Sequence, residues 1–199
     1  MTPAATDYIR HNLQKFERSI DDTAEHFSEP GDPGPGFASA PYFEKCLVLT
    51  QLDSFEGSES DYAALVKEYH RITQRLDTFN KEKGKEFRDR LFSDLQTFTH
   101  RYHAAVCHVY LGQIKPDDAC DISRRDLIGE LCRELKGDYD IPGIEALITM
   151  LDDNLSGDGG PLPECIKEFK GARFPDSNLS HSDREYPFTE KKTGSAHSE

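Results

Sequence analysis

The stretch YAALVKEYHRITQRLDTF, residues 62–79, carries the clearest structural signal of the chain. Its apolar residues recur at alternating steps of three and four residues, which places them in one stripe along an α-helix. The stripe consists of Tyr62, Leu65, Tyr69, Ile72, Leu76 and Phe79. The pattern therefore predicts an amphipathic helix whose apolar face packs against a protein core.

The same periodicity extends over most of the chain and indicates an all-α fold. Stretches rich in helix breakers separate the periodic segments, above all the Pro/Gly loop at residues 30–41, because proline lacks a backbone donor and glycine adds chain entropy. We expect one all-α domain of six or seven helices at residues 1–170 and a flexible acidic and polar tail at residues 171–199. Besides the quoted stretch, helices are predicted at residues 6–27, 41–55, 87–111, 123–135, 142–151 and 165–169. The pattern at residues 87–111 fits either one long helix or two helices with a joint near Thr99.

Glycines predict where individual helices end. Gly84, between Lys81 and Lys85, predicts a break after the quoted stretch, and Gly112 and Gly137 predict the ends of the next two helices. The residues that we expect to be largely buried are Leu65, Tyr69, Ile72, Leu76, Leu91, Leu95, Phe98, Leu127, Leu131 and Leu147.

The charge balance restricts the classes of partner. The 199 residues hold 24 Lys and Arg against 37 Asp and Glu, which gives a formal net charge of −13. This negative field repels phosphate backbones and argues against non-specific nucleic-acid binding. The expected partner is therefore a basic protein or a second copy of the chain. No apolar run reaches the roughly 18 residues of a membrane span, so we expect no membrane partner and a cytoplasmic location.

The cysteines predict a reduced protein. The five cysteines lie far apart and form no CxxC pair: Cys46, Cys107, Cys120, Cys132 and Cys165. Such spacing is typical of buried thiols and not of a disulfide framework or a zinc site.

The segment RYHAAVCHVYLG, residues 101–112, holds the residue types that most suggest chemistry. Positions seven apart on a helix face the same way, so Arg101 and His108 share one face. Ala104 and Ala105 lie between them and add little bulk.

Part of this segment resembles the globin superfamily. His108, three further residues, Gly112 and then Pro116 resemble the proximal-histidine pattern of bacterial haemoglobins and globin sensors. Residues 126–139 and 144–147 look like the last two globin helices. The stretch at residues 155–158 is similar to the related phycobiliproteins.

The resemblance implies a globin-like fold that binds haem, with gas binding or sensing as its function and not catalytic turnover. His108 would be the axial ligand of the haem iron. His70 or Gln74 would be the distal residue, and the ring of Phe55 would wedge the haem.

Two other functions stay open. Arg101 and His108 also resemble the arginine–histidine motif of the HEPN family of helical ribonucleases, which implies a metal-independent endoribonuclease that uses both residues as catalytic groups on RNA. The third hypothesis is a non-catalytic, acidic helical interaction protein, or adaptor, that docks a basic partner.

Overall fold

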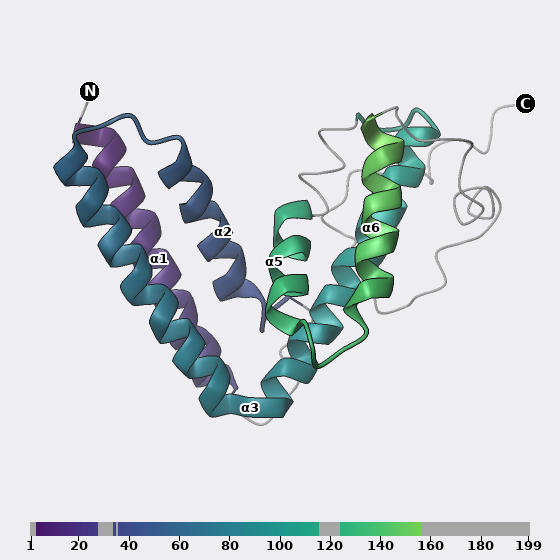
Figure 1. Cartoon of the computed structure of the whole chain (residues 1–199), viewed down its shortest axis with the longest axis horizontal. Coiled ribbons are helices and arrows are strands. Elements are labelled where there is room, and N and C mark those ends of the chain that lie inside the picture. Colours follow the sequence, from purple (N-terminus) through teal and green to yellow (C-terminus); the bar gives the residue numbers. More distant parts are fainter. Residues whose placement is uncertain (1–2, 28–33, 35, 116–123, 157–199) are drawn as a thin grey trace, which may run out of the picture. The chain divides into compact units, whose positions relative to one another are not determined.

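A computed structural model describes residues 3–27, 34, 36–115 and 124–156, and these residues are mostly helical (Figure 1). They form no strand beyond one isolated bridge between Lys136 and Tyr139. None of their helices is long and apolar enough to cross a membrane. The helices are α1 (Pro3–His26), α2 (Ala40–Asp53), α3 (Glu59–Tyr110), α5 (Arg125–Leu135) and α6 (Ile141–Ser156).

The all-α prediction is confirmed, whereas the count of six or seven helices exceeds the five in the described residues. Two predicted helices, at residues 62–79 and 87–111, are joined in the single element α3, which is kinked between them. The break itself is present at Gly84, where φ is 63° and ψ is −142°. The predicted helix at residues 165–169 and the tail at residues 171–199 lie outside the described residues.

The chain divides into two compact units. Unit 1 comprises Met1–Asp94 and Gly129–Leu135, and unit 2 comprises Leu95–Ile128 and Lys136–Glu199. Both α3 and α5 therefore contribute residues to each unit. The single domain expected at residues 1–170 stays a prediction.

Unit 1 is built on α1, α2 and the first part of α3, which run down, up and down (Figure 1). Each helix turns one apolar stripe inward, as the periodicity predicts. In α2, Tyr42 and Val48 fill the core while Phe43 and Leu47 are only half-buried. The largest fully buried side chains of the three helices are Phe16, Tyr42, Ile72, Leu76, Phe87 and Leu91.

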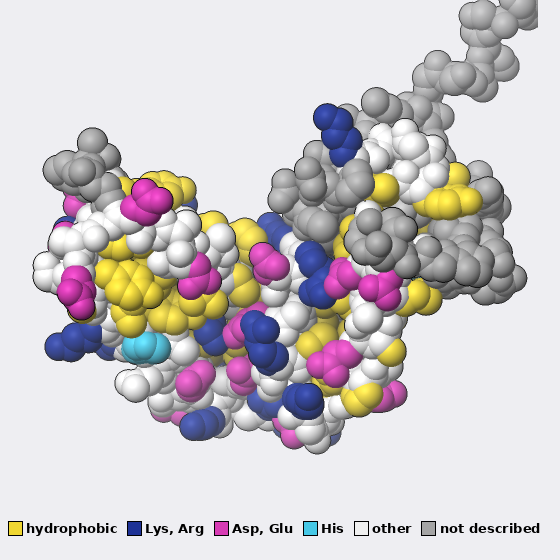
Figure 2. Space-filling view, turned by 45° about the horizontal axis from the view of Figure 1, so that its top comes forward, with side chains coloured by type: hydrophobic (Ala, Val, Ile, Leu, Met, Phe, Trp, Pro, Cys, Tyr) yellow, Lys and Arg dark blue, Asp and Glu magenta, His cyan; other side chains and the backbone are white. Residues whose placement is uncertain are grey.

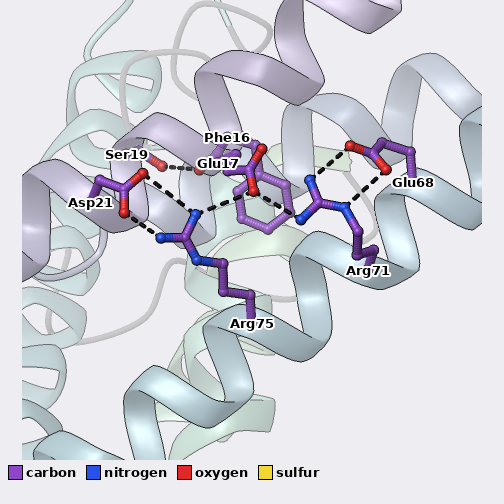
Figure 3. A network of polar contacts seen from close by, with 7 residues as sticks. All are labelled: Phe16, Glu17, Ser19, Asp21, Glu68, Arg71 and Arg75. Atoms are coloured by element: carbon purple, nitrogen blue, oxygen red, sulfur yellow. Dashed lines mark hydrogen bonds and ion pairs between the residues drawn. The ribbon is translucent and has the colours of Figure 1, made fainter.

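Ion pairs between α1 and α3 fix the register of these two parallel helices (Figure 3). Arg71 lies 2.9 Å from Glu17 and also binds Glu68, while Arg75 bridges Glu17 and Asp21. The hydrogen bonds from Arg71 lower the pKa of Glu17 and that of Glu68. Because all five side chains are partly exposed, the network contributes mainly to specificity of register and little to stability.

The start of α2 is held by a buried carboxylate from α3. Asp94 is 4% exposed and accepts hydrogen bonds from the backbone N–H groups of Gly36, at 2.7 Å, and Ser39, at 3.0 Å. Pro41 in the first turn of α2 has no N–H that would need such a partner. Asp94 thus anchors the described residues just before α2 to the core.

Unit 2 packs the second part of α3 with the start of α5 and with α6. Its core confirms the predicted burial of Leu95, Phe98 and Leu127. The prediction for Leu147 is wrong, since this side chain is only half-buried. The buried face of α6 is formed by Ile141, Ile148 and Leu151.

The two glycines Gly84 and Gly143 should respond to alanine in opposite directions. Gly84 has a positive φ with nothing near the position of an added Cβ, so Gly84→Ala meets only backbone strain. We expect it to lower the free energy of unfolding by about 1–3 kcal/mol. Gly143 lies in α6, where an added Cβ makes an ordinary 3.8 Å contact, so Gly143→Ala should stabilise by about 0.5–1 kcal/mol. Urea denaturation of both variants checks this, and a neutral Gly84→Ala would contradict the observed break.

Candidate functional site

His108 lies in the last turn of α3, where the helix ends in a Schellman motif. Gly112 has a φ of 69°, its N–H donates to the carbonyl of Val109, and the N–H of Gln113 donates to the carbonyl of His108. The predicted end at Gly112 is therefore confirmed. This motif also gives a physical reason for a glycine four residues after His108.

The imidazole of His108 is buried, with 9% of the residue exposed. The end of the helix brings Gln113 close to His108. Nδ1 of the imidazole is hydrogen-bonded to Oε1 of Gln113. An acceptor oxygen at Nδ1 requires the proton on that nitrogen, which places the lone pair on Nε2. Metal-ligating histidines are commonly oriented by such a bond from their other nitrogen.

Arg101 lies on the same helix as His108 and seven residues before it. Its side chain is half-buried and its guanidinium lies 5.5 Å from the centroid of the Phe98 ring. This stacking holds the arginine against its own helix. The ribonuclease hypothesis for Arg101 and His108 stays a prediction.

The other predicted haem residues belong to unit 1, whereas His108 belongs to unit 2. His70 and Gln74 are exposed, one turn apart on α3. Gln74 lines an open groove of about 490 Å³ between α1 and α3, beside Asp21 and Arg75. Their assignment as distal residues is not tested by these positions.

Phe55 is part of an exposed aromatic surface at one end of unit 1. Its ring stacks on that of Tyr62, with centroids 6.0 Å apart and planes at 20°. Tyr62 is 42% exposed, so the first residue of the quoted apolar stripe lies outside the core. Tyr8 of α1 is 59% exposed.

Helix register places Tyr8 at the same end of unit 1 as Phe55. The side chain of Asn12 donates to that of Gln51 at 3.0 Å, which aligns antiparallel α1 and α2. Tyr8 lies one turn before Asn12, and Phe55 lies four residues after Gln51, so both are displaced toward one end. Figure 1 shows the start of α1, the end of α2 and the start of α3 together there. We call Tyr8, Phe55 and Tyr62 the aromatic end.

Acidic side chains surround the aromatic end. Figure 2 shows hydrophobic side chains gathered on one face of unit 1, at the left of the view, with carboxylates at their edge. Glu59 is exposed and lies three residues before Tyr62, on the same face of α3. The carboxylate of neighbouring Asp61 accepts a 2.6 Å hydrogen bond from Ser58. The other exposed carboxylates at this end are Asp7, Asp53 and Glu56.

A buried ion pair holds α5 in unit 1. Lys45 of α2 lies 2.6 Å from Glu130 of α5, and both side chains are less than one-fifth exposed. Burial alone would raise the pKa of Glu130, but hydrogen bonds from Lys45 and Arg133 outweigh it and lower that pKa. Burial likewise opposes the charge on Lys45, and the bond to Glu130 raises its pKa in spite of it.

One turn further along α5, Glu134 joins a second buried group. Asn80 donates to Tyr42 at 3.3 Å and to Glu134, while Arg88 donates to the backbone carbonyl of Glu134 at 3.0 Å. Burial raises the pKa of Tyr42 and that of Glu134. These groups face each other inside unit 1, so they position α5 and offer no open site.

In unit 2, Asp152 joins three helices. Its carboxylate accepts a hydrogen bond from the hydroxyl of Tyr102 and two from Arg125, at 2.9 and 2.6 Å. The guanidinium of Arg125 also lies over the Tyr102 ring, 5.9 Å from its centroid. Burial would raise the pKa of Asp152, but the bonds from Arg125 and Tyr102 outweigh it and lower that pKa.

Among the described residues, no group of three or more His, Cys, Asp or Glu could hold a metal ion. Cys107 and Cys132 are buried, as the sequence predicts, and Cys46 is half-buried. Cys120 and Cys165 lie outside the described residues.

Comparisons with protein-family models, with curated proteins and with solved structures found no match to this chain. The residues themselves therefore carry the functional argument. Sequence periodicity alone missed the aromatic end, because it placed Tyr62 on the apolar face that packs against the core. The available signal was the position of Tyr62 near the start of its helix, among several acidic residues and before Leu65, the first buried leucine of α3.

The pKa of Asp152 predicts a pH dependence of stability. A carboxyl whose pKa is lower in the folded state contributes stability above its unfolded pKa, and this is lost as pH falls through the folded pKa. Asp152→Asn should lower the free energy of unfolding at neutral pH by about 1–3 kcal/mol. We expect a value in the lower half of this range, because Asp152 is partly exposed and solvent screens its ion pair.

The deficit of Asp152→Asn relative to the unmodified chain should narrow as pH is lowered below about 4. The matched control is Asp153→Asn, at an exposed neighbour, which should stay within about 0.5 kcal/mol at neutral pH. Urea denaturation across the pH range measures both. A deficit that is equally large at acidic pH would exclude the ionised carboxylate as its cause.

Proposed function

We propose that this protein is a non-catalytic binding module that docks a basic segment of a partner protein on the aromatic end of unit 1. The observation that carries the proposal is the exposure of Tyr8 and Tyr62, at 59% and 42%, beside the Phe55 ring stacked on Tyr62. Exposed aromatic clusters with a polar border are typical of interaction sites, and tyrosine is enriched among residues that dominate binding energy.

Charge favours a basic partner over a second copy of the chain. Each chain carries a net charge of −13, so two copies repel each other at long range. The exposed carboxylates Asp53, Glu56 and Glu59 border the aromatic end and attract a cationic segment instead, whereas Asp7 is already paired with Arg10. Apolar contact with the rings would supply affinity, and the carboxylates would supply orientation and a fast encounter.

Replacement of Tyr62 should weaken binding of a basic peptide. The probe is a labelled amphipathic peptide of Arg, Lys and Leu, titrated with the full chain and followed by fluorescence anisotropy. Tyr62→Ala removes a ring of the stacked pair and should raise Kd about tenfold or more, as loss of a central interface aromatic does.

The matched control for Tyr62→Ala is Tyr110→Ala. Tyr110 is also a tyrosine on α3, is 52% exposed, and belongs to unit 2. This variant should bind as the unmodified chain does. Equal losses in both variants, or no binding by the unmodified chain, would reject the aromatic end as the docking surface.

Haem binding through His108 is a second candidate, because Gln113 orients the imidazole with its lone pair on Nε2. His108 would supply the axial nitrogen, and bound haem would supply an iron that takes diatomic gases. The roles of His70, Gln74 and Phe55 on the distal side rest on the globin resemblance alone.

A hemin titration separates the two candidates. If His108 is an axial ligand, the full chain should give a Soret shift that saturates at one hemin per chain, and His108→Ala should abolish it. His100→Ala, at an exposed histidine of the same helix, should leave the shift intact. Spectra that are identical for the unmodified chain and His108→Ala would eliminate this candidate.

A further inference from the structure

We infer that the aromatic end selects arginine over lysine in its partner, an inference that rests on the proposed docking function. The first reason is the shape of the surface. The Phe55 and Tyr62 rings are nearly parallel, and Tyr62 presents much of its ring to solvent. A flat exposed ring suits a planar guanidinium, which stacks on aromatic faces and is less strongly hydrated than an ammonium group.

The second reason is the carboxylate beside the ring. Glu59 lies three residues before Tyr62 on α3, which is the spacing of neighbouring side chains on one helix face. An arginine stacked on Tyr62 can therefore donate its two parallel N–H groups to the Glu59 carboxylate. Such forked bonds add geometric specificity that a lysine cannot reproduce.

The protein already contains this arrangement among its own side chains. Arg125 stacks over the ring of Tyr102 and donates two hydrogen bonds to Asp152. Tyr62 and Glu59 offer the same two partners, a tyrosine ring and a carboxylate, at the surface. By contrast, the ammonium group of Lys83 lies over the rings of Phe27 and Phe79, 5.6 and 5.8 Å from their centroids. An ammonium group has no pair of parallel N–H groups for a forked bond to a carboxylate.

The partner is therefore a protein segment with at least one exposed arginine next to an apolar residue. The arginine would stack on the Phe55–Tyr62 pair and bind Glu59, and the apolar residue would cover Tyr8. Replacing this arginine by lysine keeps the charge but loses the stacking and the forked bond. We expect a tenfold or greater preference for the arginine peptide.

Two peptides that differ only in arginine or lysine test the inference on the full chain. The arginine peptide should bind at least tenfold more tightly, and Glu59→Gln should reduce this ratio to less than about threefold. Glu86→Gln, at an exposed glutamate of α3 beyond Gly84, removes the same charge and should leave the ratio unchanged. Tyr62→Phe keeps the ring and should retain the preference, whereas Tyr62→Ala should lose it.

The outcomes distinguish this inference from the proposed function. Equal affinities for the two peptides, both weakened by Tyr62→Ala, would overturn the arginine preference while docking at the aromatic end stands. Absence of binding by either peptide would overturn both. A preference that persists in Glu59→Gln and Tyr62→Ala would place the arginine site elsewhere and also overturn the inference. Circular dichroism confirms that each surface variant remains helical.

Discussion

The parallel packing of α1 against α3 is the constraint on which the rest of unit 1 depends. Phe16 and Tyr69 meet between the two helices, with ring centroids 6.3 Å apart, and exclude water from the contact. Ion pairs at the edge of this contact, including that of Arg71 with Glu17, fix the alignment of α1 along α3, which apolar surfaces alone define poorly. This register brings the starts of α1 and α3 to one end, where Tyr8 and Tyr62 are exposed together (Figure 1).

An ion pair between helices fixes their alignment in each of the two units. The Lys45–Glu130 pair of unit 1 and the Asp152–Arg125 pair of unit 2 each satisfy charges that would be costly alone. Apolar residues of equal volume could match their stability, so their value lies in specificity, because only one alignment of helices satisfies every donor and acceptor. The aromatic end differs from these ion pairs, because the rings of Tyr8 and Tyr62 face solvent together with neighbouring carboxylates.

Periodicity and helix breakers predicted much of the fold. Leu65, Ile72 and Leu76 are buried as expected, and Gly84 and Gly112 mark a break and an end, because these signals are local. Tertiary partners leave no local trace, so the sequence could not predict that Asp94 would hold the loop before α2. The glycine after His108 illustrates the ambiguity of a short motif, since helix termination alone requires it.

Amide hydrogen exchange of the full chain, with and without the arginine peptide, tests the docking surface most directly. Binding at the aromatic end predicts slower exchange at residues 5–12 and 53–66, two stretches that are far apart in sequence and hold three helix ends of unit 1. Exchange in the last turn of α3 around His108 should not change. Protection confined to residues 105–115, or spread evenly over the chain, would contradict the account.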